Sequence, residues 1–229
     1  MSRICCVLGH AGSGKTEFAI NYAVKEREQG KEVALCDLDV VNPYFRSREK
    51  QGILESLGIR VYSNSFGYNI SEDLPAVSAE MKAPFHHPQW VGVYDVGGDN
   101  IGARLLNQYK AELDSAGADY LLVVNGNRRE TDTLKGAMYH LKEVERTIDH
   151  PITGLVSNTH LMDETTEADI WKGISLCKEI QDKTGIPLRH VMGTSENLEK
   201  IMGKQQKNTM NLSFFTVKLY LKSNYRPGI

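Results

Sequence analysis

The residues best suited to chemistry form one stretch near the amino end, Gly9-His10-Ala11-Gly12-Ser13-Gly14-Lys15-Thr16, which fits the pattern G-x-x-x-x-G-K-[ST]. In such a loop the glycines let backbone N–H groups turn toward a phosphate chain. The lysine reaches the β- and γ-phosphates, and the hydroxyl holds Mg²⁺. The alternative is a chance match in a glycine-rich turn. We predict that the residues that bind a nucleotide here are Gly9, Gly12, Ser13, Gly14, Lys15 and Thr16 of this stretch, with Glu17 directly after it.

The elements on either side of this loop are those that the motif requires. The apolar run Ile4–Leu8 predicts a buried strand before it, and residues Glu17–Gln29 after it have apolar side chains at helical spacing, with Gly30 as a stop signal. The amino end of that helix would add a partial positive charge beside the phosphates.

Carboxylates follow two further predicted strands. Asp37 and Asp39 come at the end of the strand predicted over Glu32–Cys36, and Asp95 ends the apolar run that starts at Trp90. We predict that one of Asp37 and Asp39 polarises the attacking water or joins the metal shell, and that Asp95 holds Mg²⁺, usually through water. The alternatives are a solvated strand end for the first pair and a tight turn for Asp95.

Two glycines and one asparagine complete the predicted site. Gly97 and Gly98 follow Asp95, and a backbone N–H there would approach the γ-phosphate without obstruction by a side chain. Asn158 follows a late strand and is a candidate for reading the base, the alternative being a turn residue. A guanine reader of the N-K-x-D type would have Lys and Asp where this chain has Thr159 and Leu161, so we predict adenine.

The chain as a whole predicts an α/β fold with a doubly wound, mainly parallel sheet and helices on both faces, in one nucleotide-binding domain over residues 1–229. Apolar strand candidates alternate with amphipathic helices, and polar residues follow strand after strand. In an open parallel sheet these strand ends share one edge, where ligands bind. The helices expected after the first are at about 45–57, 102–113, 131–148 and 168–183, and 214–221 fits an edge strand or a helix equally well.

Composition narrows the class of protein. The 229 residues carry a net charge of −2, which gives no basic field for nucleic acid or anionic lipid. The four cysteines form no C-x-x-C pair and lie in apolar or helical patterns, so we expect buried free thiols. Met1-Ser2-Arg3 leads directly into a strand, without the pattern of a signal peptide, and no apolar run is long enough to cross a membrane. We expect a soluble cytoplasmic protein.

Taken together, these motifs resemble the MinD/ParA/CobQ group of P-loop ATPases, whose relatives include the nitrogenase iron protein. The resemblance covers most of the chain and rests on the phosphate loop, Asp37-Leu38-Asp39, Asp95-Val96-Gly97-Gly98-Asp99 and Asn158. The chain is most similar to bacterial members of unassigned role, which share a stretch like Asn42-Pro43-Tyr44-Phe45.

The resemblance implies ATP, Mg²⁺ and a nucleotide-dependent homodimer that changes shape on hydrolysis and acts on a partner protein. It implies that Lys15 and Asp39 are catalytic, that Thr16, Asp39 and Asp95 surround the metal, and that Asn158 contacts adenine. Many members carry a second lysine where this chain has His10, and that lysine reaches the partner's nucleotide. We therefore expect weak basal turnover, with Arg46, Arg48, Arg128 or Arg129 as candidates for the missing positive charge.

The function predicted from the sequence is a Mg²⁺-dependent, ATP-hydrolysing switch. Two alternatives stay open: a small-molecule kinase or ligase of the same class, with an acceptor pocket formed by Ser63–Gln89, and a nucleotide-binding module with negligible turnover. The first would form a phosphorylated small molecule instead of free phosphate, and the second would retain ADP without releasing phosphate.

Overall fold

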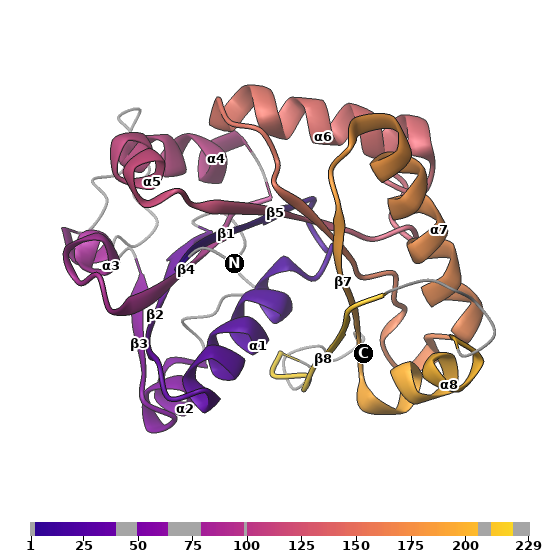
Figure 1. The fold of residues 1–229 in the computed structure, drawn as a ribbon, viewed down its shortest axis with the longest axis horizontal. Helices are drawn as coiled ribbons and strands as arrows, with labels where there is room; N and C mark the ends of the chain where they lie inside the picture. Colours follow the sequence, from indigo (N-terminus) through magenta and orange to yellow (C-terminus); the bar gives the residue numbers. More distant parts are fainter. Residues whose placement is uncertain (1–2, 40–49, 64–78, 99, 206–211, 222–229) are drawn as a thin grey trace, which may run out of the picture.

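A single parallel sheet organises the chain (Figure 1). The computed structural model describes residues 3–39, 50–63, 79–98, 100–205 and 212–221. Within these residues eight strands pair in the order β3-β2-β4-β1-β5-β6-β7-β8, and every pairing is parallel. The chain moves outward in one direction from β1 to β2 and β3, returns to insert β4, and then continues on the other side with β5. This is the doubly wound α/β arrangement that the sequence predicts.

The helices and strands have the following bounds. The strands are β1 (Ile4–Gly9), β2 (Glu32–Leu38), β3 (Ile59–Ser63), β4 (Trp90–Val96), β5 (Asp119–Val124), β6 (Gly154–Ser157), β7 (Leu188–Gly193) and β8 (Phe214–Thr216). The helices are α1 (Lys15–Glu28), α2 (Gln51–Ser56), α3 (Ala83–His86), α4 (Asn100–Leu106), α5 (Lys110–Ala116), α6 (Leu134–Ile148), α7 (Glu167–Thr184) and α8 (Ser195–Gln205), with short 3-10 turns at η2 (Ala79–Lys82), η3 (Asn107–Tyr109) and η4 (Met162–Glu164).

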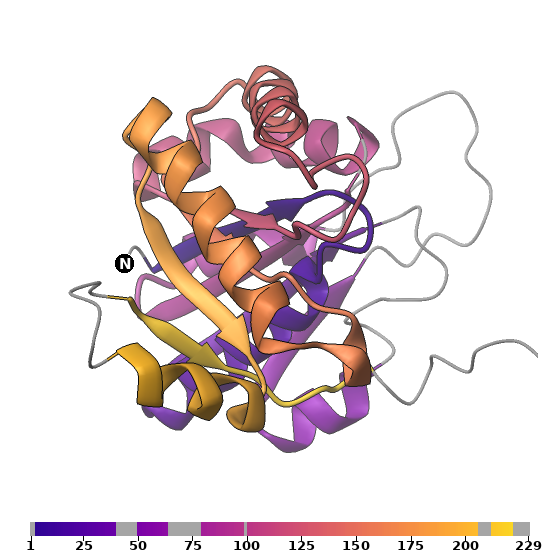
Figure 2. The same ribbon diagram turned by 90° about the vertical axis from the view of Figure 1, so that its right-hand side faces the viewer.

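Helices cover both faces of the sheet. Along β1, Cys5 and Val7 pack in the cluster that contains Phe18 and Ala19 of α1, whereas Cys6 and its alternate neighbours pack in the cluster that contains side chains of α4, α6 and α7. Figure 1 shows α1 on one side of the sheet and α4 and α6 on the other, and in Figure 2 α7 runs alongside β7. Central strands that are buried on both faces explain the continuous apolar runs in the sequence.

The cysteines fit this core as expected. Cys5, Cys6, Cys36 and Cys177 are all buried free thiols. Burial raises the pKa of each thiol above its ordinary value, so all four stay protonated. No helix among the described residues is long and apolar enough to cross a membrane.

Several element bounds differ from the sequence prediction. The helix expected at 102–113 is instead α4, η3 and α5 in succession. The helix expected from residue 131 starts at Leu134, because the Thr131 hydroxyl donates to the Asn125 carbonyl at 2.7 Å and Thr133 caps the helix instead. Helix α8 was not predicted. The expected helix at 45–57 lies partly outside the described residues.

The carboxyl-terminal stretch forms a short edge strand, β8, and the irregular segment over residues 217–221 that follows it binds α1. Asn21 accepts from the Lys218 N–H at 2.8 Å and donates to its carbonyl at 2.9 Å. Glu17 accepts the N–H groups of Tyr220 at 2.7 Å and Leu221 at 3.1 Å. The helix that begins in the phosphate loop is therefore tied to residues about 200 positions away.

This tie generates a stability prediction. We expect Asn21→Ala to lower the free energy of unfolding by about 1–3 kcal/mol, because it leaves a backbone donor and acceptor of Lys218 without their partner. Urea unfolding measures the effect, with Glu28→Ala as a control at an exposed position of the same helix. If the two variants are equally stable, Asn21 does not hold the segment.

Candidate functional site

The phosphate loop connects β1 to α1 at the carboxyl edge of the sheet. Gly14 is the residue before the helix and has φ 90°, and Gly12 has φ 74°, so both occupy the left-handed region that disfavours other residues. The Ser13 N–H donates to the His10 carbonyl at 3.0 Å and closes the turn. The pattern recognised in the sequence thus has the strand–loop–helix geometry of an anion-binding site.

The lysine of the loop is buried and paired. The Lys15 ammonium lies 3.1 Å from a carboxylate oxygen of Asp39, and the two side chains are only 4% and 3% exposed. The Asp39 backbone N–H in turn donates to Asp37 at 2.9 Å. The structure therefore brings together the two residues that the sequence predicts to be catalytic.

Asp95 lies beside this pair, at the end of the neighbouring strand. It aligns with Asp37 across β2 and β4 and is completely buried. Neither of its carboxylate oxygens has a hydrogen-bond partner of normal geometry within the described part of the chain. Burial, which outweighs the stabilising charge of Lys15, raises the pKa of Asp95 to about 8, and the nearby carboxylates of Asp37 and Asp39 add to the rise.

This carboxylate suits a hydrated divalent cation. Its unsatisfied oxygens lie close to the Thr16 hydroxyl, which itself favours the charged form of Asp95. Across the residues that the structure describes, no three His, Cys, Asp or Glu side chains have the geometry of a metal site. A Mg²⁺ ion here would therefore take most of its ligands from Thr16, water and phosphate oxygens, as Mg²⁺ commonly does, with Asp95 as the acceptor for bound water.

Of the two glycines after β4, Gly98 approaches the phosphate loop and Gly97 approaches Asp39. A Cβ added to Gly98 would lie 2.7 Å from the backbone nitrogen of Ala11, and one added to Gly97 would lie 3.4 Å from an oxygen of Asp39. Only glycine at position 98 permits this contact with the loop. Asp99, which follows, lies outside the described residues.

Side chains from two other loops hold the carbonyl groups of the phosphate loop. The Asn158 amide donates to the Ser13 carbonyl at 2.7 Å, and the Gly12 carbonyl accepts from Arg128 Nε at 3.0 Å and from Asn125 Nδ2 at 3.5 Å. Sequence reasoning placed Asn158 and Arg128 near the nucleotide but gave Asn125 no role. Its position directly after a buried strand was the available signal.

The structure does not place the side chains of the other predicted residues that it describes against the phosphate position. The carboxylate of Glu17 faces the carboxyl-terminal segment, so a contact between Glu17 and a nucleotide would have to come from its backbone. The His10 ring packs edge-on against His140 of α6, with ring centroids 5.5 Å apart. Arg46 and Arg48, with the stretch at 42–45, are outside the described residues, and Arg129 is exposed.

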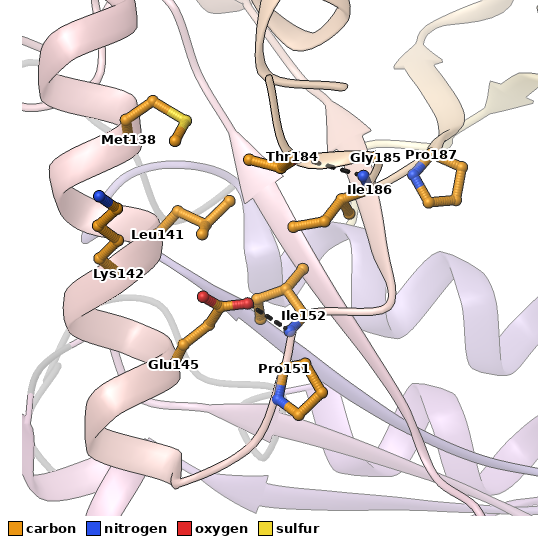
Figure 3. Close-up of a pocket in the computed structure, with 10 residues that line it drawn as sticks. All are labelled: Met138, Leu141, Lys142, Glu145, Pro151, Ile152, Thr184, Gly185, Ile186 and Pro187. Carbon is orange, nitrogen blue, oxygen red and sulfur yellow. Dashed lines mark hydrogen bonds between the residues drawn. The ribbon is translucent and has the colours of Figure 1, made fainter. Parts of the chain in front are cut away.

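A cavity of about 460 Å³ lies at the opposite edge of the sheet, between α6 and the segments that lead into β6 and β7 (Figure 3). Its walls include Met138 and Leu141 of α6 and Ile152 and Ile186 from the two segments. None of the predicted site residues lines it. The chemistry-bearing residues are gathered at the carboxyl edge instead.

Comparison with protein-family models and with curated proteins finds no match. Among solved structures, the cell division protein FtsY from Thermotoga maritima is similar, with a TM-score of 0.60 and 22% identity over 85% of this chain and 62% of that chain. Chloroplast FtsY from Physcomitrella patens has a TM-score of 0.58 and 18% identity, over 83% of this chain and 58% of that one.

The signal recognition particle 54 kDa protein from Aeropyrum pernix, solved in complex with GDP, has a TM-score of 0.53 and 20% identity, over 82% of this chain and 40% of that one. The chain thus spans less than two thirds of the length of each of these structures. The likeness is one of fold, and the shared fold is the α/β fold of P-loop nucleotide-binding proteins.

The high pKa of Asp95 generates a prediction for the nucleotide-free protein. Because folding raises this pKa from 3.8 to about 8, the folded state holds a proton that the unfolded state releases. The bound proton adds to the free energy of unfolding. This stabilisation is complete below the pKa of the unfolded state and is lost as the pH rises toward 8. We therefore expect the free energy of unfolding to fall between about pH 5 and pH 8.

Asp95→Asn removes the titrating group and should flatten this dependence, whose upper limit is about 1.4 kcal/mol per pH unit. Urea unfolding in the presence of a chelator measures it, with Asp132→Asn, at an exposed position, as the control. Equal slopes in the wild type and in Asp95→Asn would contradict the assignment of the bound proton to Asp95.

Proposed function

We propose that the protein is a Mg²⁺-dependent ATPase that works as a nucleotide-controlled switch. The observation that carries this proposal is the placement of Lys15, Asp39 and Asp95 together beneath a glycine loop that opens a helix. Hydrolysis would proceed by attack of water on the γ-phosphate, helped by positioning and by neutralisation of charge. Mg²⁺, when bound, would neutralise charge on the β- and γ-phosphates.

The residues of the chain divide this work between them. The N–H groups of the loop from Gly9 to Gly14, with Gly97 and Gly98 nearby, would surround the phosphates. Lys15 would exchange its contact with Asp39 for phosphate oxygens. Asp39, released from the lysine, would then accept a hydrogen bond from the attacking water and orient it.

Adenine is the base that we propose. The Asn158 amide nitrogen is already bound to the loop, so Asn158 would contact a base through its amide oxygen. Thr159 is buried and accepts the Gly126 N–H at 2.8 Å, and Leu161 is 46% exposed, so neither supplies the charges of a guanine reader. The GDP in the Aeropyrum pernix structure makes GTP the competitor to test first.

The wider assignments are proposals of the same kind. The order of the motifs supports membership of the MinD/ParA/CobQ group, and the single sheet supports one nucleotide-binding domain over residues 1–229. We further propose a cytoplasmic protein that forms a nucleotide-dependent homodimer and acts on a partner protein. Movement of the segments that follow Asp39 and Asp95 would carry the signal.

Binding of nucleotide tests the proposal first. We expect Lys15→Met to lower the affinity for ATP by roughly 100-fold or more, because a buried positive charge opposite the phosphates is lost. Calorimetry with ATP, GTP and ADP makes the measurement, with the exposed Lys135→Met as a control. The double variant Lys15→Met, Asp39→Asn keeps the test valid if the single change leaves Asp39 too poorly paired to fold. Unchanged affinity, or GTP bound better than ATP, would contradict the corresponding claim.

A second prediction concerns Asp39, where we expect a substitution to lower turnover without lowering the affinity for ATP. Asp39→Asn frees Lys15 from its ion pair, so we expect ATP to bind at least as tightly as in the wild type. Phosphate release should fall by about 100-fold or more, because the group that orients water is lost. Isothermal titration and a phosphate-release assay separate the two effects. If affinity and turnover fall together, Asp39 is a binding or structural residue. A phosphorylated small molecule in place of free phosphate would favour a kinase.

A further inference from the structure

We propose that Arg128 is a positioning residue that holds the phosphate loop in its anion-binding shape and thereby sets the affinity for the diphosphate part of the nucleotide. The inference rests on the proposed function and deepens it. It assigns Arg128 a place at the outer side of the loop, and it replaces the expectation that this arginine reaches the γ-phosphate.

Three side chains donate hydrogen bonds to carbonyl groups of the phosphate loop. Arg128 and Asn125, both from the loop after β5, donate to the Gly12 carbonyl, and Asn158, from the loop after β6, donates to the next carbonyl, that of Ser13. Successive N–H groups form an anion-binding concavity only when the carbonyls between them point outward. Donors that hold two consecutive carbonyls therefore preserve the form of the loop that accepts phosphate.

Arg128 lies directly against the loop. A Cβ added to Gly12 would lie 2.9 Å from the guanidinium carbon of Arg128, well inside the distance that real side chains tolerate. Gly12 suits its backbone conformation, with φ 74°, and a side chain there would displace the Arg128 guanidinium from its present position. The contact is made at Gly12, between the two motif glycines Gly9 and Gly14, on the carbonyl side of the peptide.

The loop that carries Arg128 is itself well anchored. The Arg128 N–H donates to the Asn125 carbonyl at 3.2 Å, and its own carbonyl accepts from the Thr131 N–H at 2.9 Å. The Asn127 side chain donates to Asp169 at the start of α7 at 2.8 Å. Because the backbone on both sides of Arg128 is bonded, the arginine can place its guanidinium with little loss of further backbone freedom.

The positive charge of Arg128 acts on His160, which lies near the phosphate loop. His160 lies next to Gly14, with its Nε2 3.5 Å from the position of an added Cβ. Burial is the main cause that lowers the pKa of His160, and the positive charge of Arg128 lowers it further. Arg128 therefore contacts the Gly12 carbonyl and lies close enough to His160 for its charge to act on that ring.

This position separates two roles that an arginine can have. An arginine that stabilises the γ-phosphate in the transition state changes turnover by about 10³-fold or more. An arginine that shapes the loop changes the binding of ADP and ATP alike and leaves turnover at saturating ATP nearly unchanged, because the loss occurs in the ground state as well.

The test is calorimetry with ADP and with Mg·ATP, combined with turnover at saturating ATP, for Arg128→Ala, Arg128→Lys and a control, Arg146→Ala, whose arginine is 75% exposed on α6. We expect Arg128→Ala to weaken ADP and ATP equally, by about tenfold, because a charged donor is lost from a carbonyl. Arg128→Lys should recover part of this loss, and turnover at saturation should change by less than about twofold. A large fall in turnover with unchanged ADP affinity would overturn the proposal in favour of a γ-phosphate contact.

A measurement without nucleotide distinguishes failure of this inference from failure of the proposed function. In Arg128→Ala we expect faster hydrogen exchange at the loop amides, and a higher pKa for His160 in an NMR titration, because a nearby positive charge is gone. If the wild type binds no nucleotide, the proposed function fails, and exchange at the loop still decides the role of Arg128. If exchange and ADP affinity both match the wild type, Arg128 does not position the loop.

Discussion

The structure depends on one cluster of buried charge, in which the Lys15 ammonium meets the carboxylate of Asp39 beside the fully buried Asp95. Charges of one sign are costly to bury unless an opposite charge or a proton compensates them. Lys15 compensates Asp39, and a raised pKa lets Asp95 keep its proton near neutral pH. A phosphate chain and Mg²⁺ would compensate the charges of all three groups. The free energy needed to bury these groups without nucleotide would therefore favour nucleotide binding.

The fold brings these groups to the carboxyl edge of the sheet. Parallel pairing sets Asp37 opposite Asp95 across β2 and β4, and the return of the chain to β4 places that strand directly beside β1 and its loop. The loop then receives support from the other side, where Asn125, Arg128 and Asn158 hold its carbonyls. Contacts with the residues after β4 on one side and with these three side chains on the other hold the loop of small residues in a defined shape.

Much of this arrangement could be predicted from the sequence, because its causes are local or follow from sheet topology. The loop motif, the strand before it and the helix after it were readable from spacing, and parallel strands bring their carboxyl ends together. The contacts of Glu17 were not readable, since its partners Tyr220 and Leu221 lie about 200 residues later. Thr131 and Thr133 are equally good helix caps by type, and only the bond from Thr131 to the Asn125 carbonyl decides between them. The contact between Arg128 and the Gly12 carbonyl could not be predicted either, because it depends on how two loops far apart in the sequence pack together.

In the proposed function, nucleotide binds at the carboxyl edge of the sheet and draws Lys15 from Asp39 to phosphate. Hydrogen exchange followed by mass spectrometry, with and without Mg·ADP, tests it most directly because it maps binding along the whole chain. We expect slower exchange in the peptides that contain the loop at 9–16 and the strand ends at 37–39 and 95–98, with no change around the cavity beside α6. Protection at that cavity, or no protection anywhere at saturating nucleotide, would contradict the proposed function.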